Sequence, residues 1–321
     1  MRGTKTKFYI VACSLIVAPI AHADLTITSA GALEGLSLST FVTGFSTANG
    51  VGPLGLGFAG GKVYISDYPG KLHIFNSDSD GQTVGSETQI SYGQENSVQI
   101  ATLGNSLYMG QRGSLNDVVK LKLDGTIDSM VVGGVSYCTG LVANNQNGKL
   151  YASGVNNGPI WEIDPSNNTK TAFSNTSADG VSVSPDGKIL YAASGNGHVY
   201  GFDTQTKAQV FDSGAISGGI DGTAAGTGTF SNSLFVNTNS GTLWEINLTT
   251  LSQTLIATNG SRGDFVTVDP LNDTLLITQT DRIIRLNGGH FTTPEPSSVL
   301  AIGVGIAFAA RRRKKQGHSR R

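Results

Sequence analysis

Short apolar runs recur along the middle of the chain, and each contains a Tyr, Phe or Leu flanked by other apolar residues. These central residues are Tyr64, Tyr108, Tyr151, Tyr191, Phe235 and Leu276. The spacings between them are 44, 43, 40, 44 and 41 residues. A regular period of this length is typical of a repeat architecture. The runs lack the 3.6-residue periodicity of an amphipathic helix, so each repeat is predicted to consist of strands.

A second apolar run follows each of the first, after a turn rich in Gly, Asn, Ser and Asp. The second runs are residues 72–75, 118–121, 160–163, 199–202, 243–246 and 283–286. Repeats of this length with short strands indicate propeller blades, which bury their apolar faces by stacking on one another. We therefore predict an all-β, six-bladed β-propeller over residues 24–290. A seven-bladed ring and a two-sheet sandwich are the alternatives.

The ring must also close. The last repeat ends near residue 289 with too few residues left for a fourth strand, whereas residues 36–42 form an apolar run before the first repeat. We predict that this N-terminal strand completes the sixth blade and removes an exposed sheet edge. The repeats resemble the YVTN/NHL class of secreted propellers, most closely in the segment Val-Ser-Pro-Asp-Gly-Lys-Ile-Leu-Tyr at residues 183–191.

The N-terminal residues read as a secretory signal peptide. Three basic residues precede an apolar run over residues 8–18, and the triplet Ala21-His22-Ala23 follows. The run is too short to span a bilayer comfortably, which favours cleavage before Asp24 over an uncleaved anchor. Residues 1–23 are therefore expected to be removed. Cys138 is then the only cysteine, so no intramolecular disulfide forms and we expect this side chain to be buried as a small hydrophobe.

The C-terminal residues 291–321 form a third unit. The triplet Pro294-Glu295-Pro296 is followed by the apolar residues 299–310 and then by five basic residues, Arg311, Arg312, Arg313, Lys314 and Lys315. Prolines disfavour a helix before the apolar run, the run partitions into the bilayer, and a basic cluster prefers the cytoplasmic side. The stretch is shorter than the roughly 20 residues of an unstrained span, and snorkelling arginines can supply part of the difference. We predict a transmembrane helix that leaves the body outside the cytoplasm.

This order of parts resembles the PEP-CTERM sorting tail of Gram-negative bacteria. The resemblance implies that an exosortase recognises the tail, cleaves near the Pro-Glu-Pro triplet and passes the protein to the surface or to an extracellular polysaccharide matrix. The expected partners are therefore the exosortase, the membrane and extracellular polysaccharide. The expected location is first the inner membrane, facing the periplasm, and then the cell surface or matrix.

The formal net charge of −1 conceals an acidic body. Ten of the 22 basic residues lie in the two terminal segments, so residues 24–293 contain 12 basic against 22 acidic side chains, a net charge of −10. An acidic body repels phosphate backbones, which argues against a nucleic-acid partner.

One polar residue recurs 12 to 14 positions before the central residue of five repeats. These residues are Asn96, Thr139, Asp179, Asp221 and Asp264. Once the blades are stacked, they are expected to stand on one rim of the central channel. A rim with three carboxylates is suited to a cation or a polyol, since hard cations prefer oxygen ligands. The alternative is that each side chain caps the turn into its innermost strand.

A second candidate site lies within the first blade. Residues Asn76, Asp78 and Asp80, followed by Gly81 and Glu87, match the spacing of a 12-residue calcium loop. The segment resembles an EF-hand loop and, more loosely, the calcium hairpins of integrin-like propellers, which makes calcium the candidate cofactor. It departs from them at Asn76, which replaces the usual first Asp, and it lacks flanking amphipathic helices. A solvated hairpin turn is the alternative.

Nothing in the sequence forms a nucleophile constellation. The chain has no Gly-x-Ser-x-Gly elbow and no Ser and His that can be placed together, so we predict no catalytic residues. The predicted function is that of an exported binding or structural module associated with polysaccharide at the cell surface or in the matrix. The alternative is a propeller hydrolase or lactonase with a rim-bound metal, which would need several carboxylates and a base around a deep pocket. No regular flat array of Thr side chains supports an ice-active surface.

Overall fold

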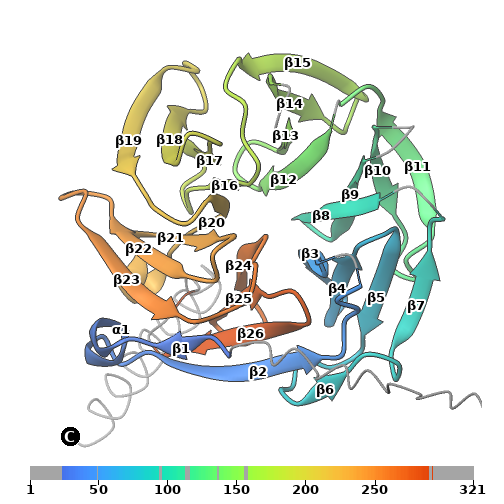
Figure 1. The fold of residues 1–321 in the computed structure, drawn as a ribbon. Helices are drawn as coiled ribbons and strands as arrows, with labels where there is room; N and C mark the ends of the chain where they lie inside the picture. The colour runs from blue at the N-terminus through green and yellow to red at the C-terminus, as the bar shows by residue number, and fades with distance from the viewer. Residues whose placement is uncertain are drawn as a thin grey trace, which may run out of the picture.

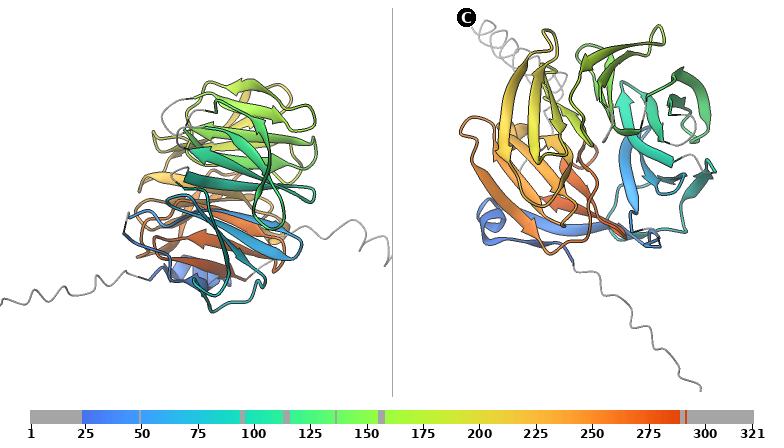
Figure 2. Two further views of the ribbon diagram at one scale, coloured as in Figure 1. Left: turned by 90° about the vertical axis from the view of Figure 1, so that its right-hand side faces the viewer. Right: turned by 45° about the horizontal axis from the view of Figure 1, so that its top comes forward.

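The computed structural model describes residues 24–288 and Phe291, apart from residues 49, 94–95, 113–115, 136 and 155–157. The described residues form six sheets, antiparallel except for one short pairing in the sixth, arranged as blades around a central channel (Figure 1). Seen from the side, the ring is a disc with the blades stacked around its axis (Figure 2). The prediction of a six-bladed β-propeller is therefore confirmed for the body of the chain.

The first three blades each take their strands from one continuous stretch of sequence, in order from the channel outward. Blade 1 consists of β3 (Pro53–Ala59), β4 (Lys62–Asp67), β5 (Lys71–Phe75) and β7 (Thr88–Ser91). Blade 2 consists of β8 (Asn96–Leu103), β9 (Ser106–Arg112), β10 (Val118–Leu121) and β11 (Ile127–Val132). Blade 3 consists of β12 (Cys138–Asn144), β13 (Lys149–Gly154), β14 (Ile160–Asp164) and β15 (Thr169–Ser174).

Blade 4 follows the same pattern and consists of β16 (Val181–Val183), β17 (Ile189–Ala193), β18 (His198–Asp203) and β19 (Gln209–Ala215). The last two blades also take strands from other parts of the sequence. Blade 5 consists of β20 (Ile220–Ala225), β21 (Ser233–Thr238), β22 (Leu243–Asn247), β23 (Gln253–Thr258) and β1 (Thr26–Ile27). Blade 6 consists of β24 (Val266–Asp269), β25 (Thr274–Thr278), β26 (Arg282–Asn287), β2 (Ser37–Thr43) and β6 (Gln82–Thr83).

The N-terminal strand closes the ring as predicted. Strand β2 pairs antiparallel with β26, in a register that sets Leu38 opposite Leu286. Two further contacts are absent from the prediction. Strand β1 pairs with β23 of blade 5, and β6, which leaves blade 1, pairs parallel with β2. The short helix α1 (Ser29–Leu33) joins β1 to β2, with Thr28 as its N-cap. The closure therefore joins blades 5, 6 and 1.

The apolar core lies between neighbouring blades. The six central residues of the sequence repeat all fall in the second strand of a blade, and all are buried. One cluster joins Tyr64 and Ile74 of blade 1 to Leu107 and Val119 of blade 2. Because these contacts cross from sheet to sheet, each blade depends on its neighbours for burial of its apolar surface.

Phe291 packs into the body of the propeller. Its fully buried ring stacks on Phe230 at 4.8 Å between ring centroids, and it meets the edge of Phe235 at 5.7 Å. The predicted signal peptide and sorting tail lie outside the described residues, so both stay predictions on structural grounds. Among the residues that the structure describes, no helix is long and apolar enough to cross a membrane.

Candidate functional site

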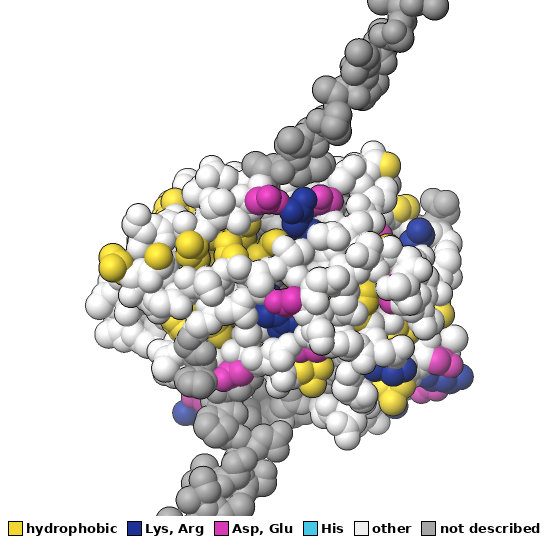
Figure 3. Space-filling model, turned by 90° about the horizontal axis from the view of Figure 1, so that it is seen from below, with side chains coloured by type: hydrophobic (Ala, Val, Ile, Leu, Met, Phe, Trp, Pro, Cys, Tyr) yellow, Lys and Arg dark blue, Asp and Glu magenta, His cyan; other side chains and the backbone are white. Residues whose placement is uncertain are grey.

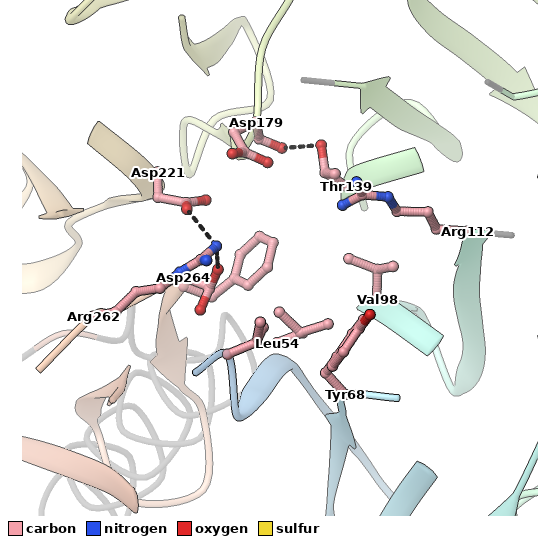
Figure 4. A pocket seen from close by; sticks show the side chains of 11 residues that line it. Leu54, Tyr68, Val98, Arg112, Thr139, Asp179, Asp221, Arg262 and Asp264 are labelled. Atoms are coloured by element: carbon pink, nitrogen blue, oxygen red, sulfur yellow. Dashed lines mark hydrogen bonds and ion pairs between the residues drawn. The ribbon is translucent and has the colours of Figure 1, made fainter. Parts of the chain in front are cut away.

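The central channel opens into a cavity of about 370 Å³ at the end where the innermost strands begin. Its polar wall comes from blades 2 to 6, and Figure 4 shows these side chains pointing toward the channel axis. They are Arg112, Thr139, Asp179, Asp221, Arg262 and Asp264. Four of the five predicted rim residues thus lie around one cavity. The fifth, Asn96, begins β8 opposite Arg112, and its side chain is outside what the structure describes.

Glycines after three of the rim residues let the blades approach closely. A Cβ atom on Gly140 would lie 2.6 Å from the carbonyl oxygen of Asp179. On Gly180 it would lie 2.4 Å from the carbonyl oxygen of Asp221, and on Gly222 it would lie 2.7 Å from that of Asp264. Distances below about 3 Å leave no room for a side chain, so only glycine allows this spacing. The repeated glycine therefore brings successive rim residues together.

Arg262 lies within the group of carboxylates. Its Nη2 donates a hydrogen bond to Asp264 Oδ1 at 2.5 Å and lies 3.9 Å from Asp221 Oδ2. Arg112 enters the cavity from blade 2, and its guanidinium carbon lies 5.2 Å from the centroid of the Tyr137 ring. The polar wall therefore combines three carboxyl groups with two guanidinium groups.

Burial raises the pKa of all three carboxyl groups. The pKa of Asp264 rises to about 6, because burial and the charge of Asp179 outweigh the opposing effect of Arg262. The pKa of Asp221 rises well above its usual range, first through burial and then through the charges of Asp179 and Asp264. Arg262 and the side chain of Asn239 oppose this rise only in part. Burial also raises the pKa of Asp179.

Asp221 does not cap a turn. The residue is 1% exposed, and neither carboxylate oxygen accepts a hydrogen bond of ordinary geometry. Asp264 Oδ2 and Arg262 Nε also lack hydrogen-bond partners. The Thr139 hydroxyl bonds to the neighbouring blade, donating to the carbonyl oxygen of Asp179 at 3.0 Å. Buried polar atoms without partners are rare in native proteins, so each such atom calls for an explanation.

The opposite wall of the cavity is apolar. Leu54, Val98 and Phe265 are buried and form a small cluster, against which Val51 and Tyr68 pack. These residues come from blades 1, 2 and 6. Sequence reasoning missed this wall, as well as Arg112 and Arg262. The cavity has one polar and one apolar side, a lining that suits a small ligand with both kinds of surface.

The lining residues include no His, Cys or Lys. Within the described ranges, no group of three or more His, Cys, Asp or Glu side chains has the arrangement of a metal site. Any acid–base chemistry in the cavity would therefore depend on the carboxyl groups. The arrangement is suited to hydrogen bonding with a ligand.

The structure does not gather the predicted calcium ligands around one point. Arg285 donates hydrogen bonds to Asp78 Oδ1 at 2.8 Å and to Asp80 Oδ1 at 2.7 Å, whereas Glu87 Oε1 lies 2.6 Å from Nδ1 of His73. Asn76 is exposed. The carboxylates thus have cationic or imidazole partners within the protein, which the spacing of the loop could not reveal. The loop attaches to blade 6 through Arg285.

The edge of the ring that carries β2 shows the same type of pairing. Small groups of acidic and basic side chains lie together there among mostly neutral ones (Figure 3).

Two titratable side chains away from the cavity are buried in the interior, and one of them is the cysteine for which the sequence predicts burial. Cys138 is fully buried, and burial raises its thiol pKa to about 12. His73 is also buried, with Nε2 lying 3.4 Å from Asp67 Oδ2.

Comparisons with solved structures agree with the fold. A chain titled auxiliary nutrient binding protein, from Bacteroides thetaiotaomicron, matches with a TM-score of 0.60 at 13% identity, over 83% of this chain and 76% of that one. A protein of unknown function from the same species matches with a TM-score of 0.59 at 9% identity, over 78% and 75%. A chain of a mitotic checkpoint complex matches with a TM-score of 0.53 at 12% identity, over 72% of this chain and 72% of that one. Identities this low establish a shared fold only.

None of the curated protein sequences matches this chain. Residues 292–314 match the model of the PEP-CTERM protein-sorting motif and begin immediately after Phe291. This confirms the resemblance that the Pro-Glu-Pro triplet, the apolar run and the basic cluster suggested. The motif implies secretion and processing by an exosortase at the membrane. The chain is therefore a surface-directed six-bladed β-propeller protein with a PEP-CTERM sorting motif.

Proposed function

We propose that this protein is a binding module of the cell surface or extracellular matrix, and that its channel mouth holds extracellular polysaccharide. The observation that carries the proposal is the two-sided cavity, with carboxyl and guanidinium groups on one wall and Leu54, Val98 and Phe265 on the other. Sugar rings present hydroxyl groups at their edges and C–H groups on their faces. Ligand pockets of this type combine apolar contact area with a few polar groups that fix orientation.

The route to the surface follows from the two chain ends. A signal peptide over residues 1–23 would start export, and a hydrophobic helix after the Pro-Glu-Pro triplet would hold the chain in the inner membrane with the propeller in the periplasm. Cleavage by an exosortase would then release the propeller to the surface or matrix. A binding role suits this route, since a polysaccharide ligand is found where the protein is delivered.

The sorting part of the proposal predicts retention of a tail variant. Replacing Pro294, Glu295 and Pro296 together by alanine is expected to leave the uncleaved chain in the inner-membrane fraction, because the triplet is the proposed recognition element. Cell fractionation and immunoblotting measure this. A Gln316→Ala, His318→Ala variant, changed outside the matched range 292–314, serves as control and should sort normally. Undiminished surface delivery of the triple variant would contradict the proposed route.

The binding part predicts saturable association with polysaccharide. Full-length protein in mild non-ionic detergent should co-sediment with surface polysaccharide from the producing cells, and excess soluble oligosaccharide should release it. Because hydroxyl contacts carry the proposed binding, raising the salt concentration should weaken it little. Failure to bind any neutral or acidic polysaccharide would remove this function.

The propeller hydrolase or lactonase alternative has less support. It would use a rim-bound metal and a base, and the cavity walls provide no histidine or lysine for that role. The guanidinium of Arg262 also occupies a position beside the carboxylates. Release of reducing ends or opened lactones during the binding assay would favour this alternative.

A further inference from the structure

The channel mouth presents unsatisfied hydrogen-bonding atoms of both kinds. Three are acceptors, the two carboxylate oxygens of Asp221 and Asp264 Oδ2, and one is a donor, Arg262 Nε. All three residues line the same cavity, with Asp221 directed toward its interior (Figure 4). Leaving such atoms without partners is unfavourable. A ligand that supplies both donors and acceptors recovers that free energy.

A simple cation fits these atoms poorly. Arg262 already places a positive charge 3.9 Å from Asp221 and 2.5 Å from Asp264, so an added cation would be repelled. A cation also provides no acceptor for Arg262 Nε. An anionic ligand would meet three carboxyl groups, Asp179, Asp221 and Asp264, against two guanidinium groups in the same confined space. Hydroxyl groups avoid both difficulties, because each one can donate and accept.

The protonation behaviour of the wall is compatible with a neutral ligand. Burial, together with Asp179 and Asp264, holds the pKa of Asp221 well above its usual range, while Arg262 and Asn239 oppose this effect. An ionised carboxyl accepts hydrogen bonds from hydroxyls, and a protonated one also donates. In either state, a ligand without charge avoids the cost of bringing a further charge into the cavity.

We infer that the channel mouth binds one neutral sugar ring, whose adjacent hydroxyls bond to Asp221, Asp264 and Arg262 while its C–H face lies on Leu54, Val98 and Phe265. This inference rests on the proposed function and narrows it to neutral saccharides. A cavity of about 370 Å³ lies at the small end of the range for ligand pockets, roughly 300–1,000 Å³, which favours a single sugar unit over a long chain segment.

The test compares Asp221→Asn with the wild-type chain by titration calorimetry, using neutral and uronic-acid oligosaccharides. The variant keeps its shape but replaces one acceptor oxygen with a donor. Affinity for the neutral oligosaccharide is expected to fall about ten-fold or more, as loss of a hydrogen bond to a charged group implies. Asp128→Asn, on the outermost strand β11 with a half-exposed side chain, is the matched control and should bind normally.

Thermal melting shows whether the variant still folds, and it has its own expected result. Because the pKa of Asp221 is higher in the folded than in the unfolded chain, the folded protein loses stability as the pH rises from about 4 through the folded-state pKa. Asparagine does not titrate, so the variant is free of this loss. Asp221→Asn should therefore melt at a higher temperature than wild type at pH 8 and at nearly the same temperature at pH 5. A lower melting temperature at pH 8 would mean that Asp221 is satisfied within the protein, which would overturn the inference.

The binding outcomes separate the inference from the function on which it rests. Unchanged affinity of Asp221→Asn for neutral sugar would mean that the sugar binds elsewhere on the protein. The inference would then be wrong, and the proposed polysaccharide binding would stand. Binding of uronic-acid oligosaccharides alone would refute the neutral ligand while preserving the binding module. Wild-type protein that binds neither class would remove both.

Discussion

Replacing Arg285 by methionine is expected to lower the free energy of unfolding by about 3–5 kcal/mol, the usual cost of removing one partner from a buried ionic group. The Arg285 side chain is 4% exposed and bonds to three carboxylates. Asp269 accepts from Nη1 at 2.5 Å, Asp80 from Nε at 2.7 Å and Asp78 from Nη2 at 2.8 Å. Methionine fills much of the space but leaves these groups without their cation.

The effect should be large because this cluster joins distant parts of the chain. Asp78 and Asp80 belong to the loop between β5 and β7 of blade 1, whereas Asp269 and Arg285 belong to blade 6. Burial already raises the pKa of Asp78 to about 6, and the hydrogen bond from Arg285 opposes that rise. Without the guanidinium, the loop would lose its charged attachment to blade 6 and keep the hydrogen bonds from Asn272 to Asp78 and the short pairing of β6 with β2.

Urea denaturation measures the loss, and Arg282→Met provides a matched control on the same strand. Arg282 pairs with Asp281 and Asp24, and its side chain is 23% exposed. Ion pairs that are partly exposed to solvent contribute about 0–1 kcal/mol to stability. Arg282→Met should therefore lower the free energy of unfolding far less than Arg285→Met. Equal losses for the two variants would show that the Arg285 cluster has no special role in closure.

The same cluster explains why a calcium interpretation of residues 76–87 was reasonable and incomplete. Spacing along the sequence places oxygen ligands at suitable intervals, yet it carries no information about a cation about 200 residues away. In the folded chain Arg285 provides the positive charge that the loop requires. Local motifs can predict which charges a loop presents, but the partner depends on ring closure.

The ring itself could be predicted because the sequence pattern that produces each blade recurs along the chain. Every blade needs the same alternation of apolar and polar residues, so the period and the buried central residues were evident from the sequence. The positions of Thr139, Asp179, Asp221 and Asp264 followed from the same register. The glycine after three of them provided a further signal that was overlooked, since Gly140, Gly180 and Gly222 set the blade spacing.

The rest of the site does not repeat and could not be predicted. Arg262 occurs at its position in one blade only, and Arg112 comes from the end of a second strand, where no periodic pattern marks it. Leu54 and Val98 look like ordinary strand residues in the sequence. They form the apolar wall of the cavity only because the first strands of different blades converge on the axis. Strands β1 and β6 were missed because they are two residues long.

A second large effect is expected at the N-terminal closing strand. Phe41 on β2 is fully buried, meets the edge of Phe75 in blade 1 at 6.0 Å between ring centroids, and lies 5.2 Å below the guanidinium of Arg285. Phe41→Ala should reduce the free energy of unfolding by about 3–5 kcal/mol, through lost apolar burial and the cavity left behind. Urea denaturation of the full-length chain in mild detergent measures this loss.

Two comparisons make that result specific to closure. Leu33→Ala, at a residue of helix α1 that is 89% exposed, should change stability by less than about 0.5 kcal/mol. Because the Arg285 guanidinium lies over the Phe41 ring, either single change removes their shared contact, so the double variant should lose less stability than the sum of the two single losses. Strict additivity would mean that the strand and the Arg285 cluster stabilise the ring independently, and the closure would then comprise two separate attachments.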